Sequence, residues 1–203
     1  MNLSAFRDNI IRHVGTALVY TVLSVIAFGF VYPFVMTGIA QLAFPSQANG
    51  SIVYVNGKPV GSAIIGQLWT KPQYFRGRPS AAGKGYDPTS TGGTNFGPTS
   101  KRLIDGTRAT IAALRKENPD ATVPMPMDLV TSSGSGIDPD ISPQAALYQA
   151  PRVAKARYLP TAVVVALINR HVHGRTFGFL GEPRVNVLEV NLALDGAQVT
   201  KKP

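Results

Sequence analysis

Hydrophobic and polar residues divide the chain into two regions of different character. No Asp, Glu, Lys or Arg occurs in the 44 residues between His13 and Lys58. Residues 14–44 are apolar on every side of a helix, and a helix needs only about 20 such residues to cross a ~30 Å hydrocarbon layer. The pattern predicts one transmembrane helix over 14–44, with a short N-terminus (1–13) before it and one soluble domain (45–203) after it.

Two other interpretations of the apolar run fit less well. A cleaved signal peptide has an apolar region of about 7–15 residues, roughly half the length found here. A core helix of a soluble protein carries its apolar residues in one stripe rather than all round. Within the predicted helix, Pro33 removes one backbone hydrogen bond and is expected to introduce a kink, and Pro45 ends the helix.

The charges that flank the helix indicate its orientation. Arg7 and Arg12 precede it closely, whereas the first basic residue after it is Lys58. Because basic residues remain on the cytoplasmic side, the N-terminus is predicted to be cytoplasmic and residues 45–203 periplasmic.

The second region begins with β-strand patterns. Residues 51–55 and 58–60 flank Asn56-Gly57, which predicts a hairpin with a type I′ turn. Residues 62–67 are expected to form another strand. Residues 76–100 are so rich in Gly, Pro, Ser and Thr that they predict a long loop, a feature of functional or disordered segments.

Helical patterns follow the loop. Thr99 or Ser100 begins a predicted amphipathic helix that ends near Lys116. Ser142-Pro143 begins a short helix that Pro151 is expected to interrupt.

A further helix is predicted from Pro160 to Gly174, and apolar residues alternate over 186–194 as in a half-buried strand. The predicted fold class is therefore α+β: a transmembrane helix, then one soluble domain with a small sheet and about three helices.

Composition narrows the classes of function. The chain has no cysteine, which excludes disulfides, thiolate metal sites and a cysteine nucleophile. Its net charge is +9, of which +8 lies beyond residue 13, but the cations occur singly or in pairs. This dispersal argues against nucleic acid and favours an anionic lipid surface or an acidic partner subunit.

Two loops resemble catalytic motifs incompletely. In residues 77–85, one extra residue separates Gly77 from Gly83, and Gly85 stands where a phosphate-binding loop has Ser or Thr. The Ser132–Ser135 loop lacks the leading glycine of a nucleophile elbow. A membrane-anchored, exported serine hydrolase using this loop is the alternative function that we consider.

Other polar residues favour structural roles. His171 and His173 lie two positions apart near a predicted helix end, so they cannot share a metal as residues four apart can. Asp138 and Asp140 are too few for a hard-cation cage and are expected to shape a turn and cap the next helix.

Six motifs, in order, nevertheless resemble those of one family, KdpC, the C subunit of the Kdp potassium-transporting P-type ATPase. The motifs are GSAIIGQ (61–67), YFRGRPSA (74–81), STGGTNFGPTS (90–100), PMDLVTSSGSGIDPDISP (126–143), RVAKAR (152–157) and GEPRVNVLEVNLAL (181–194). The resemblance covers nearly the whole chain and includes the N-terminal helix.

The resemblance implies a single-pass, non-catalytic subunit of a bacterial inner-membrane complex. Its implied partners are a channel-like K⁺-translocating subunit, a P-type ATPase subunit and a very short helical subunit. The chain itself lacks the DKTGT phosphorylation motif. Two roles are implied: assistance in assembly, and a catalytic chaperone role that raises the ATP affinity of the ATPase subunit in a ternary complex. Gln149 matches a family glutamine implicated in that nucleotide contact, and no other cofactor is implied.

The implied ATP contact and the predicted topology are in tension. A periplasmic Gln149 lies where ATP is scarce, so either the helix has the opposite orientation or the effect on ATP is indirect. An exported domain instead suits a position over the outer mouth of the K⁺-translocating subunit, with its cations facing acidic groups or lipid.

Overall fold

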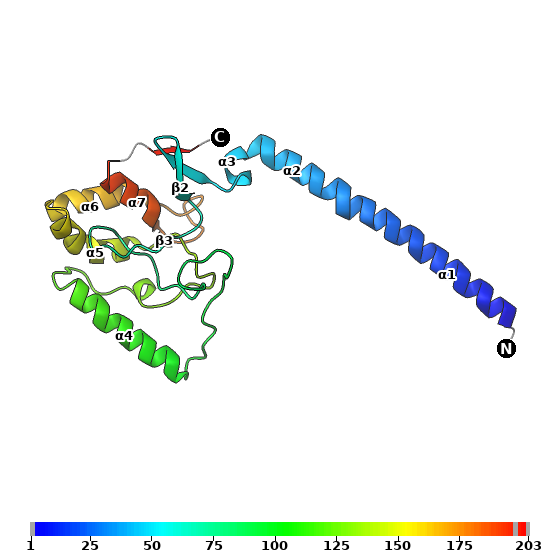
Figure 1. Ribbon diagram of the computed structural model, residues 1–203, viewed down its shortest axis with the longest axis horizontal. Helices are drawn as coiled ribbons and strands as arrows, with labels where there is room; N and C mark the ends of the chain where they lie inside the picture. Colours follow the sequence, from blue (N-terminus) through cyan, green and yellow to red (C-terminus); the bar gives the residue numbers. More distant parts are fainter. Residues whose placement is uncertain (1–2, 197–198, 202–203) are drawn as a thin grey trace. The chain divides into compact units, whose positions relative to one another are not determined.

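The computed structural model describes residues 3–196 and 199–201 and divides into two compact units between Gly50 and Ser51 (Figure 1). The first unit is helical, and none of its described side chains is buried. The second unit contains two three-stranded sheets and several helices. The predicted α+β fold class, with its N-terminal apolar helix, is confirmed.

The first unit is a long apolar helix. It consists of α1 (Leu3–Ser24), a π-helical segment η1 (Val25–Val31), α2 (Tyr32–Ala43) and the short α3 (Pro45–Ala48). The 35 residues Asn9–Ala43 are long and apolar enough to cross a membrane, and the most apolar part of this stretch has no buried side chain. The helix therefore has no place in the core of this chain.

Pro33 disturbs the helix without ending it. The Tyr32 N–H donates to the carbonyl of Ala27, five residues back, at the end of the π-helical segment. A proline has no N–H, and its ring crowds the carbonyl four residues earlier, here that of Gly29. The wider π-helical turns accommodate this crowding directly ahead of the proline, and α2 continues to Ala43.

The predicted hairpin is confirmed in the first sheet. β1 (Ile52–Val55) pairs antiparallel with β2 (Lys58–Ser62) on one side and with β6 (Val199–Lys201) on the other. Asn56 and Gly57 have φ values of 51° and 77°, as a type I′ turn requires.

The strand predicted over residues 62–67 is wrong. Ser62 is the last residue of β2, and the chain turns at once. The Ser62 hydroxyl accepts from the Ile64 N–H and its carbonyl accepts from the Ile65 N–H, both at 3.3 Å. These local bonds replace the ladder that a strand would need.

The second sheet is formed by three short strands in the antiparallel order β3-β5-β4: β3 (Asp140–Ile141), β5 (Arg184–Asn186) and β4 (Val172–His173). The helix α6 (Thr161–Arg170) ends four residues before the predicted Gly174, because Val172 and His173 pair with β5.

The predicted interruption at Pro151 is also wrong, since α5 (Pro143–Ala156) runs through it. Residues on both sides of the proline are buried, among them Ala146 and Val153. Packing on both sides therefore outweighs the hydrogen bond that the proline cannot donate. At the start of α5, the Ser142 hydroxyl accepts from the Ala145 N–H at 3.0 Å, as the Ser-Pro pattern predicts.

Residues 187–194 form a helix, α7, where a strand was predicted. Leu188 and Leu192, four residues apart, pack against Val53 of the first sheet. Val187 and Val190, three residues apart, belong to the main core. Two helix faces buried in two clusters thus produce an alternation that imitates a strand.

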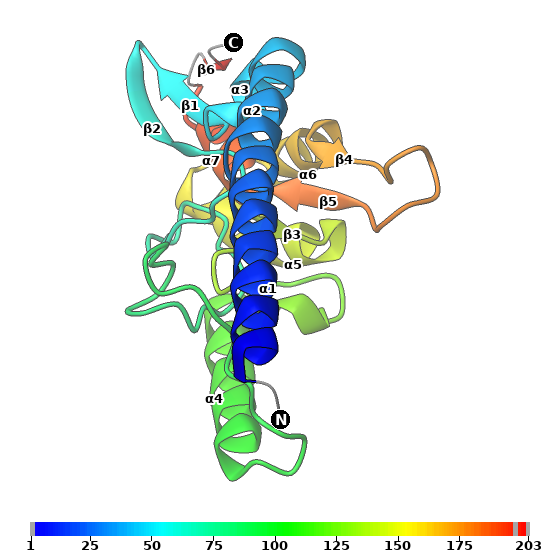
Figure 2. The ribbon, with the colours of Figure 1, turned by 90° about the vertical axis from the view of Figure 1, so that its right-hand side faces the viewer.

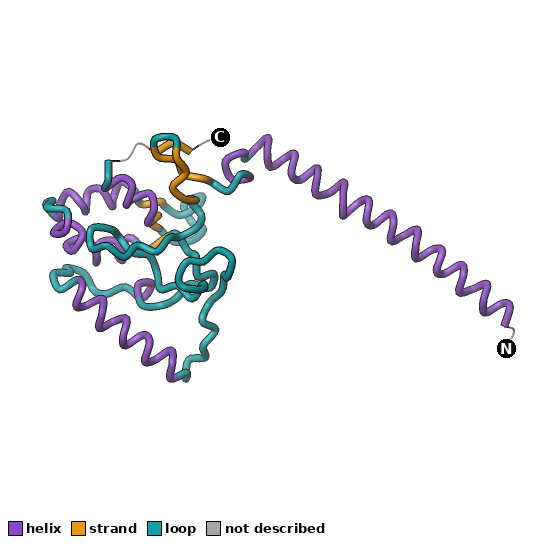
Figure 3. Tube along the Cα trace, in the orientation of Figure 1, coloured by secondary structure: helices purple, strands orange, loops and turns teal. Residues whose placement is uncertain are grey.

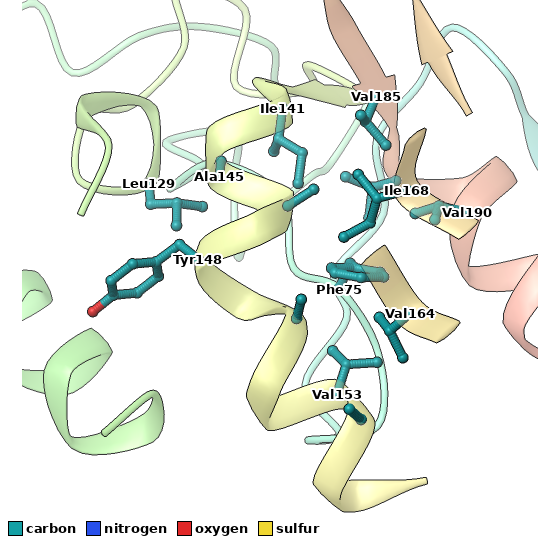
Figure 4. Close-up of a cluster of buried hydrophobic side chains, with 14 residues drawn as sticks. Phe75, Leu129, Ile141, Ala145, Tyr148, Val153, Val164, Ile168, Val185 and Val190 are labelled. Carbon is teal, nitrogen blue, oxygen red and sulfur yellow. The ribbon is translucent and has the colours of Figure 1, made fainter. Parts of the chain in front are cut away.

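The main core lies between α5, α6 and the second sheet (Figure 4). Phe75 reaches this core from the long loop, and its side chain is fully buried. The predicted helix is confirmed as α4 (Lys101–Glu117), with Ser100 at its N-cap. Between Ser62 and α4 the chain forms only turns and loops, visible as the teal trace in Figure 3. Phe75 therefore anchors an otherwise irregular segment.

Candidate functional site

Two buried side-chain amides hold the long loop at Phe75 and Arg76. Asn191 of α7, which is completely buried, accepts from the Phe75 N–H at 2.8 Å and donates to the Phe75 carbonyl at 2.9 Å. The Asn191 amide thereby pairs with both the backbone N–H and the backbone carbonyl of Phe75, as a neighbouring strand would.

Gln149 does the same for Arg76. Its side-chain oxygen accepts from the Arg76 N–H at 2.9 Å, and its side-chain nitrogen donates to the Arg76 carbonyl at 3.1 Å. The same oxygen also accepts from Arg152 at 2.7 Å, and the nitrogen donates to the Ala145 carbonyl at 3.3 Å. Gln149 is only 1% exposed, so all four hydrogen-bonding positions of its amide are used within the chain.

Arg152 adds a second layer of contacts around this segment. Its guanidinium donates to the side chain of Asn118 at 3.0 Å and to the carbonyl of Tyr74 at 3.1 Å, and it also reaches the carbonyl of Pro72. Burial and then the neighbouring Arg76 lower the pKa of Arg152 to about 10, against the opposing effect of Glu117. The loop is thus held by side chains rather than by a β-ladder.

A cavity of about 380 Å³ lies against Gln149 and Arg76, between the loop and α4. Its wall carries three cations, Arg76, Arg78 and Lys84, and one carboxylate, Glu117, which accepts two bonds of 2.6 and 2.7 Å from Arg76. Arg78 in turn pairs with Asp138 at 3.0 Å, so Lys84 is the one lining cation without an ion pair among the described residues.

Three residues that line this cavity each carry a buried N–H group without a hydrogen-bond partner within the chain. The groups are the indole N–H of Trp69 and the Nε–H groups of Arg76 and Arg78, and they are the only buried polar side-chain atoms without a partner in the described part of the chain. Cationic guanidinium groups beside an aromatic wall suit a phosphate or carboxylate. The three N–H groups are themselves buried, so what the cavity wall offers an oxyanion is the charge of its cationic side chains.

Tyr86 closes one side of the cavity. Its hydroxyl donates to the Arg78 carbonyl at 2.6 Å. Burial, followed by the charge of Asp138, raises its pKa to about 12, while Arg78 opposes the shift. Its ring lies so close to Gly77 that a Cβ on this glycine would be 2.2 Å from the phenol oxygen.

Part of this cavity comes from the incomplete phosphate-loop motif. Lys84, from the incomplete phosphate-loop motif, does line the cavity, whereas Trp69, Arg76 and Arg78 were not singled out. The YFRGRPSA segment carries both arginines, but only the fold shows that Gln149, 73 residues beyond Arg76, reaches the same wall. A fully bonded Gln149 amide positions Arg76 and has no hydrogen-bonding position free for a ligand.

The serines of the Ser132–Ser135 loop bond locally. The Ser133 hydroxyl accepts from the Gly136 N–H at 2.8 Å, and the Ser135 hydroxyl accepts from the Ile137 N–H at 3.3 Å. The Ser132 hydroxyl lies 3.5 Å from that of Thr94. Among the hydrogen bonds of the described residues, none joins a histidine to this loop.

The two histidines have separate partners. His171 bonds to the carbonyl of Leu167 at 2.9 Å, and His173 bonds to Glu189 at 2.9 Å. No group of three potential metal ligands occurs among residues 3–196 and 199–201.

The two aspartates shape the turn before β3. Asp138 accepts from the Asp140 N–H at 3.0 Å, which is the expected turn. The expected cap comes instead from Ser142, whose N–H is held by Asp128 at 2.7 Å. Asp140 pairs with Arg184 at 3.0 Å. Burial raises the pKa of Asp140, and the charge of Arg184 is the main effect that opposes this rise.

Comparison with known proteins places these features in a family. The family model described as "KdpC: K+-transporting ATPase, c chain" matches residues 14–196. A potassium-transporting ATPase KdpC subunit of Acidobacterium capsulatum is 53% identical over 184 residues, which cover 91% of this chain and 98% of that relative.

Two further relatives with the same description agree. The protein of Caulobacter vibrioides is 53% identical over 186 residues, covering 91% of this chain and 93% of the relative. That of Koribacter versatilis is 47% identical over 192 residues, covering 95% and 98%. The match includes the apolar helix, the loop held at Phe75 and Arg76, and the cavity. This chain belongs to the KdpC family, the c chain of the K⁺-transporting ATPase.

Proposed function

We propose that this chain is a non-catalytic accessory subunit that assists assembly of a K⁺-transporting ATPase in the bacterial inner membrane. Residues 14–44 anchor it, with 1–13 in the cytoplasm and 45–203 in the periplasm. K⁺ translocation and ATP hydrolysis belong to a channel-like subunit and a P-type ATPase subunit, with a very short helical subunit as third partner. The main support is that the family match begins at residue 14 and so includes the apolar helix.

Assembly of the complex tests the accessory role. Deleting this chain is expected to reduce the yield of the complex in purified membranes and to abolish K⁺-stimulated ATP hydrolysis. The control is the double variant Ser132→Ala/Ser135→Ala, which is expected to retain both assembly and transport. A complex that assembles and transports K⁺ fully without this chain would overturn the proposal. Loss of a hydrolytic turnover in the serine variant, with its fold retained, would favour the hydrolase alternative.

Protease accessibility tests the topology. In intact spheroplasts, an added protease is expected to cleave after Lys58 and beyond, since the domain is proposed to face outward. In inverted vesicles the same domain is expected to be protected. The reverse pattern would contradict the orientation while leaving the accessory role open to the assembly test.

The distribution of charge suggests what the exported domain faces. Ion pairs use several cations, such as Arg157 with Asp195 at 2.7 Å, but basic residues still exceed acidic ones by eight beyond residue 13. We propose that the excess faces acidic groups of the partners or anionic lipid. Charge reversal at Arg102, Arg108 and Arg115, exposed on α4, is expected to weaken assembly. Unchanged assembly and transport would contradict this.

Nucleotide binding in a ternary complex with the ATPase subunit is the second candidate. It is supported by the cavity, where Gln149 holds Arg76 beside Arg78 and Lys84. Gln149 then acts by positioning Arg76. Because ATP is scarce in the periplasm, a direct contact between this domain and ATP is incompatible with the exported topology.

Titration of the complex with a fluorescent ATP analogue tests this candidate. Lys84→Gln is expected to weaken binding, whereas Lys116→Gln, exposed on α4 outside the cavity, is not. Gln149→Ala is expected to weaken binding as well, because Arg76 loses its support. Equal affinity in all variants would place the nucleotide wholly on the partner.

A further inference from the structure

The connection between β4 and β5, residues 174–183, is a hairpin that stands out from the domain (Figure 2). Thr176 and Leu180 exchange two backbone hydrogen bonds, each of 2.9 Å. The turn between them is Phe177-Gly178-Phe179. Its apolar side chains face solvent: Phe177 is 84% exposed, Phe179 69% and Leu180 49%.

This arrangement is unfavourable in an isolated chain. Phe177 has a φ of 53°, a left-handed conformation that bulky residues rarely adopt, and Gly178 follows at 81°. Phe177, Phe179 and Leu180 belong to neither hydrophobic cluster of the described residues. Backbone strain combined with fixed exposure of apolar groups is characteristic of a surface that binds something.

Basic residues surround the base of the hairpin. Arg175 pairs with Glu182 at 2.7 Å, and Arg184 pairs with Asp140 at 3.0 Å. Arg170, exposed at the end of α6, lies two residues before β4. Glu189 bonds to His173 of β4 at 2.9 Å, so three acidic groups balance the three arginines, and Arg170 has no ion pair among those of the described residues. An apolar aromatic tip above basic residues has the composition of segments that lie in the headgroup region of anionic membranes.

A bilayer is also within reach of the chain. The apolar helix ends at Ala43 and the first strand of the domain begins at Ile52. Nine residues span at most about 30 Å even when fully extended. The start of β1 can therefore lie no farther than this span from the end of the apolar helix.

We propose that the 174–183 hairpin inserts Phe177, Phe179 and Leu180 into the headgroup region of the bilayer and acts as a second membrane contact. A lipid surface is the occupant that the observations favour, since phenylalanine and leucine offer apolar area without hydrogen-bonding groups and Arg170, which has no ion pair among those of the described residues, suits a headgroup phosphate. The proposal rests on the membrane anchor proposed above but not on the accessory role.

Spin labelling of the full chain tests the insertion. Because the chain contains no cysteine, Phe179→Cys provides a unique site for a nitroxide. The labelled chain is reconstituted in vesicles of phosphatidylethanolamine and phosphatidylglycerol, and the accessibility of the nitroxide to oxygen and to a water-soluble nickel complex is measured. The ratio of oxygen to nickel accessibility is expected to be several-fold higher than for a label at Met127→Cys, an exposed apolar position in the 3₁₀ helix Met127–Leu129.

A second substitution separates insertion from local structure. Adding Phe177→Ser to the Phe179→Cys chain is expected to lower the ratio to that of the Met127→Cys label, whereas adding Met127→Ser is expected to leave it unchanged. The fluorescence of Trp69, the single tryptophan, reports whether the domain remains folded in each variant.

Three results would overturn the proposal. A label at position 179 as accessible to nickel as that at 127, in a chain that resists carbonate extraction, would refute the hairpin contact alone. Extraction of the chain by carbonate would refute the anchor and the hairpin contact together. In vesicles that contain the assembled complex, protection from both oxygen and nickel would place the tip in a pocket of a partner subunit instead.

Discussion

The apolar helix and the folded domain use the same residue types in opposite ways. In the helix, the most apolar part of Asn9–Ala43 has no buried side chain, whereas Val53, Phe75 and Ile168 of the domain are completely buried. The helix satisfies its backbone within itself, and its surrounding solvent decides its stability. The domain must instead satisfy the backbone of a long loop, and it does so with specific buried side chains.

This difference predicts different kinds of vulnerability. A helix suited to lipid is expected to tolerate changes of shape but not of charge, because none of its described side chains is buried within this chain. The domain tolerates changes on its surface but not the loss of an amide that holds its loop. Substitutions in each region test this contrast.

Gln149→Ala is expected to lower the free energy of unfolding of the domain by about 3–5 kcal/mol, because it leaves the N–H and the carbonyl of Arg76 buried without partners. Urea unfolding followed by the fluorescence of Trp69 measures this change. Gln144→Ala, exposed on the same helix, is the matched control and is expected to have no effect. A loss below about 1 kcal/mol would mean that the loop holds its conformation without this amide.

Ile26→Arg is expected to raise the free energy of membrane insertion by about 3 kcal/mol, since the charge lies near the centre of the apolar stretch. The fraction of chains that insert into microsomes measures this cost. Leu42→Arg, near the end of the stretch, is expected to cost less because its side chain can reach the interface. The free energy of unfolding of the domain is expected to be unchanged in both variants. A lower free energy of unfolding in either variant would contradict the independence of the two regions.

Ser142→Ala is expected to destabilise the domain by about 1–2 kcal/mol, because α5 loses the hydroxyl that accepts from the Ala145 N–H. Ser100→Ala is the matched control, since Ser100 occupies the N-cap of α4 without a side-chain hydrogen bond. Urea unfolding is expected to show a change only in the first variant. Equal losses would show that capping is not the cause.

Tyr86 is expected to make stability fall between pH 10 and 12, because its pKa of about 12 in the folded domain lies above the ordinary value of 10.0. In this range the folded domain keeps a proton that the unfolded chain releases, so raising the pH favours unfolding, by about 1 kcal/mol near pH 11. Tyr86→Phe is expected to lose this part of the pH dependence. Tyr158→Phe, at a position that is 96% exposed, is expected to retain it. Identical pH profiles for the two variants would contradict the assignment.

Local signals in the sequence were sufficient for part of the fold. The Asn56-Gly57 turn, the Ser142-Pro143 helix start and α4 were predicted correctly, because each depends on a few neighbouring residues. The prediction failed at Pro151 and over residues 186–194, where burial decides the outcome. A rule about one residue cannot include packing against segments far away in the chain.

The candidate site shows the same limit. Lys84 and Gln149 were identified from motifs, but the cavity that they share was not. Arg76, Arg78 and Trp69 meet Gln149 only because α5 and α7 hold the loop at two adjacent residues. Contacts across more than 70 residues leave no periodic pattern to detect.

The sequence by itself determined the apolar helix, the α+β class and the family motifs, because each depends on the order and spacing of residue types along the chain. Only the tertiary structure decided that Gln149 supports Arg76, that buried side chains hold an irregular loop at Phe75 and Arg76, and that Phe177 and Phe179 lie exposed on the surface of the domain. The physical reason is that a hydrogen bond and a buried surface both require a partner, and the sequence does not state which residues become neighbours.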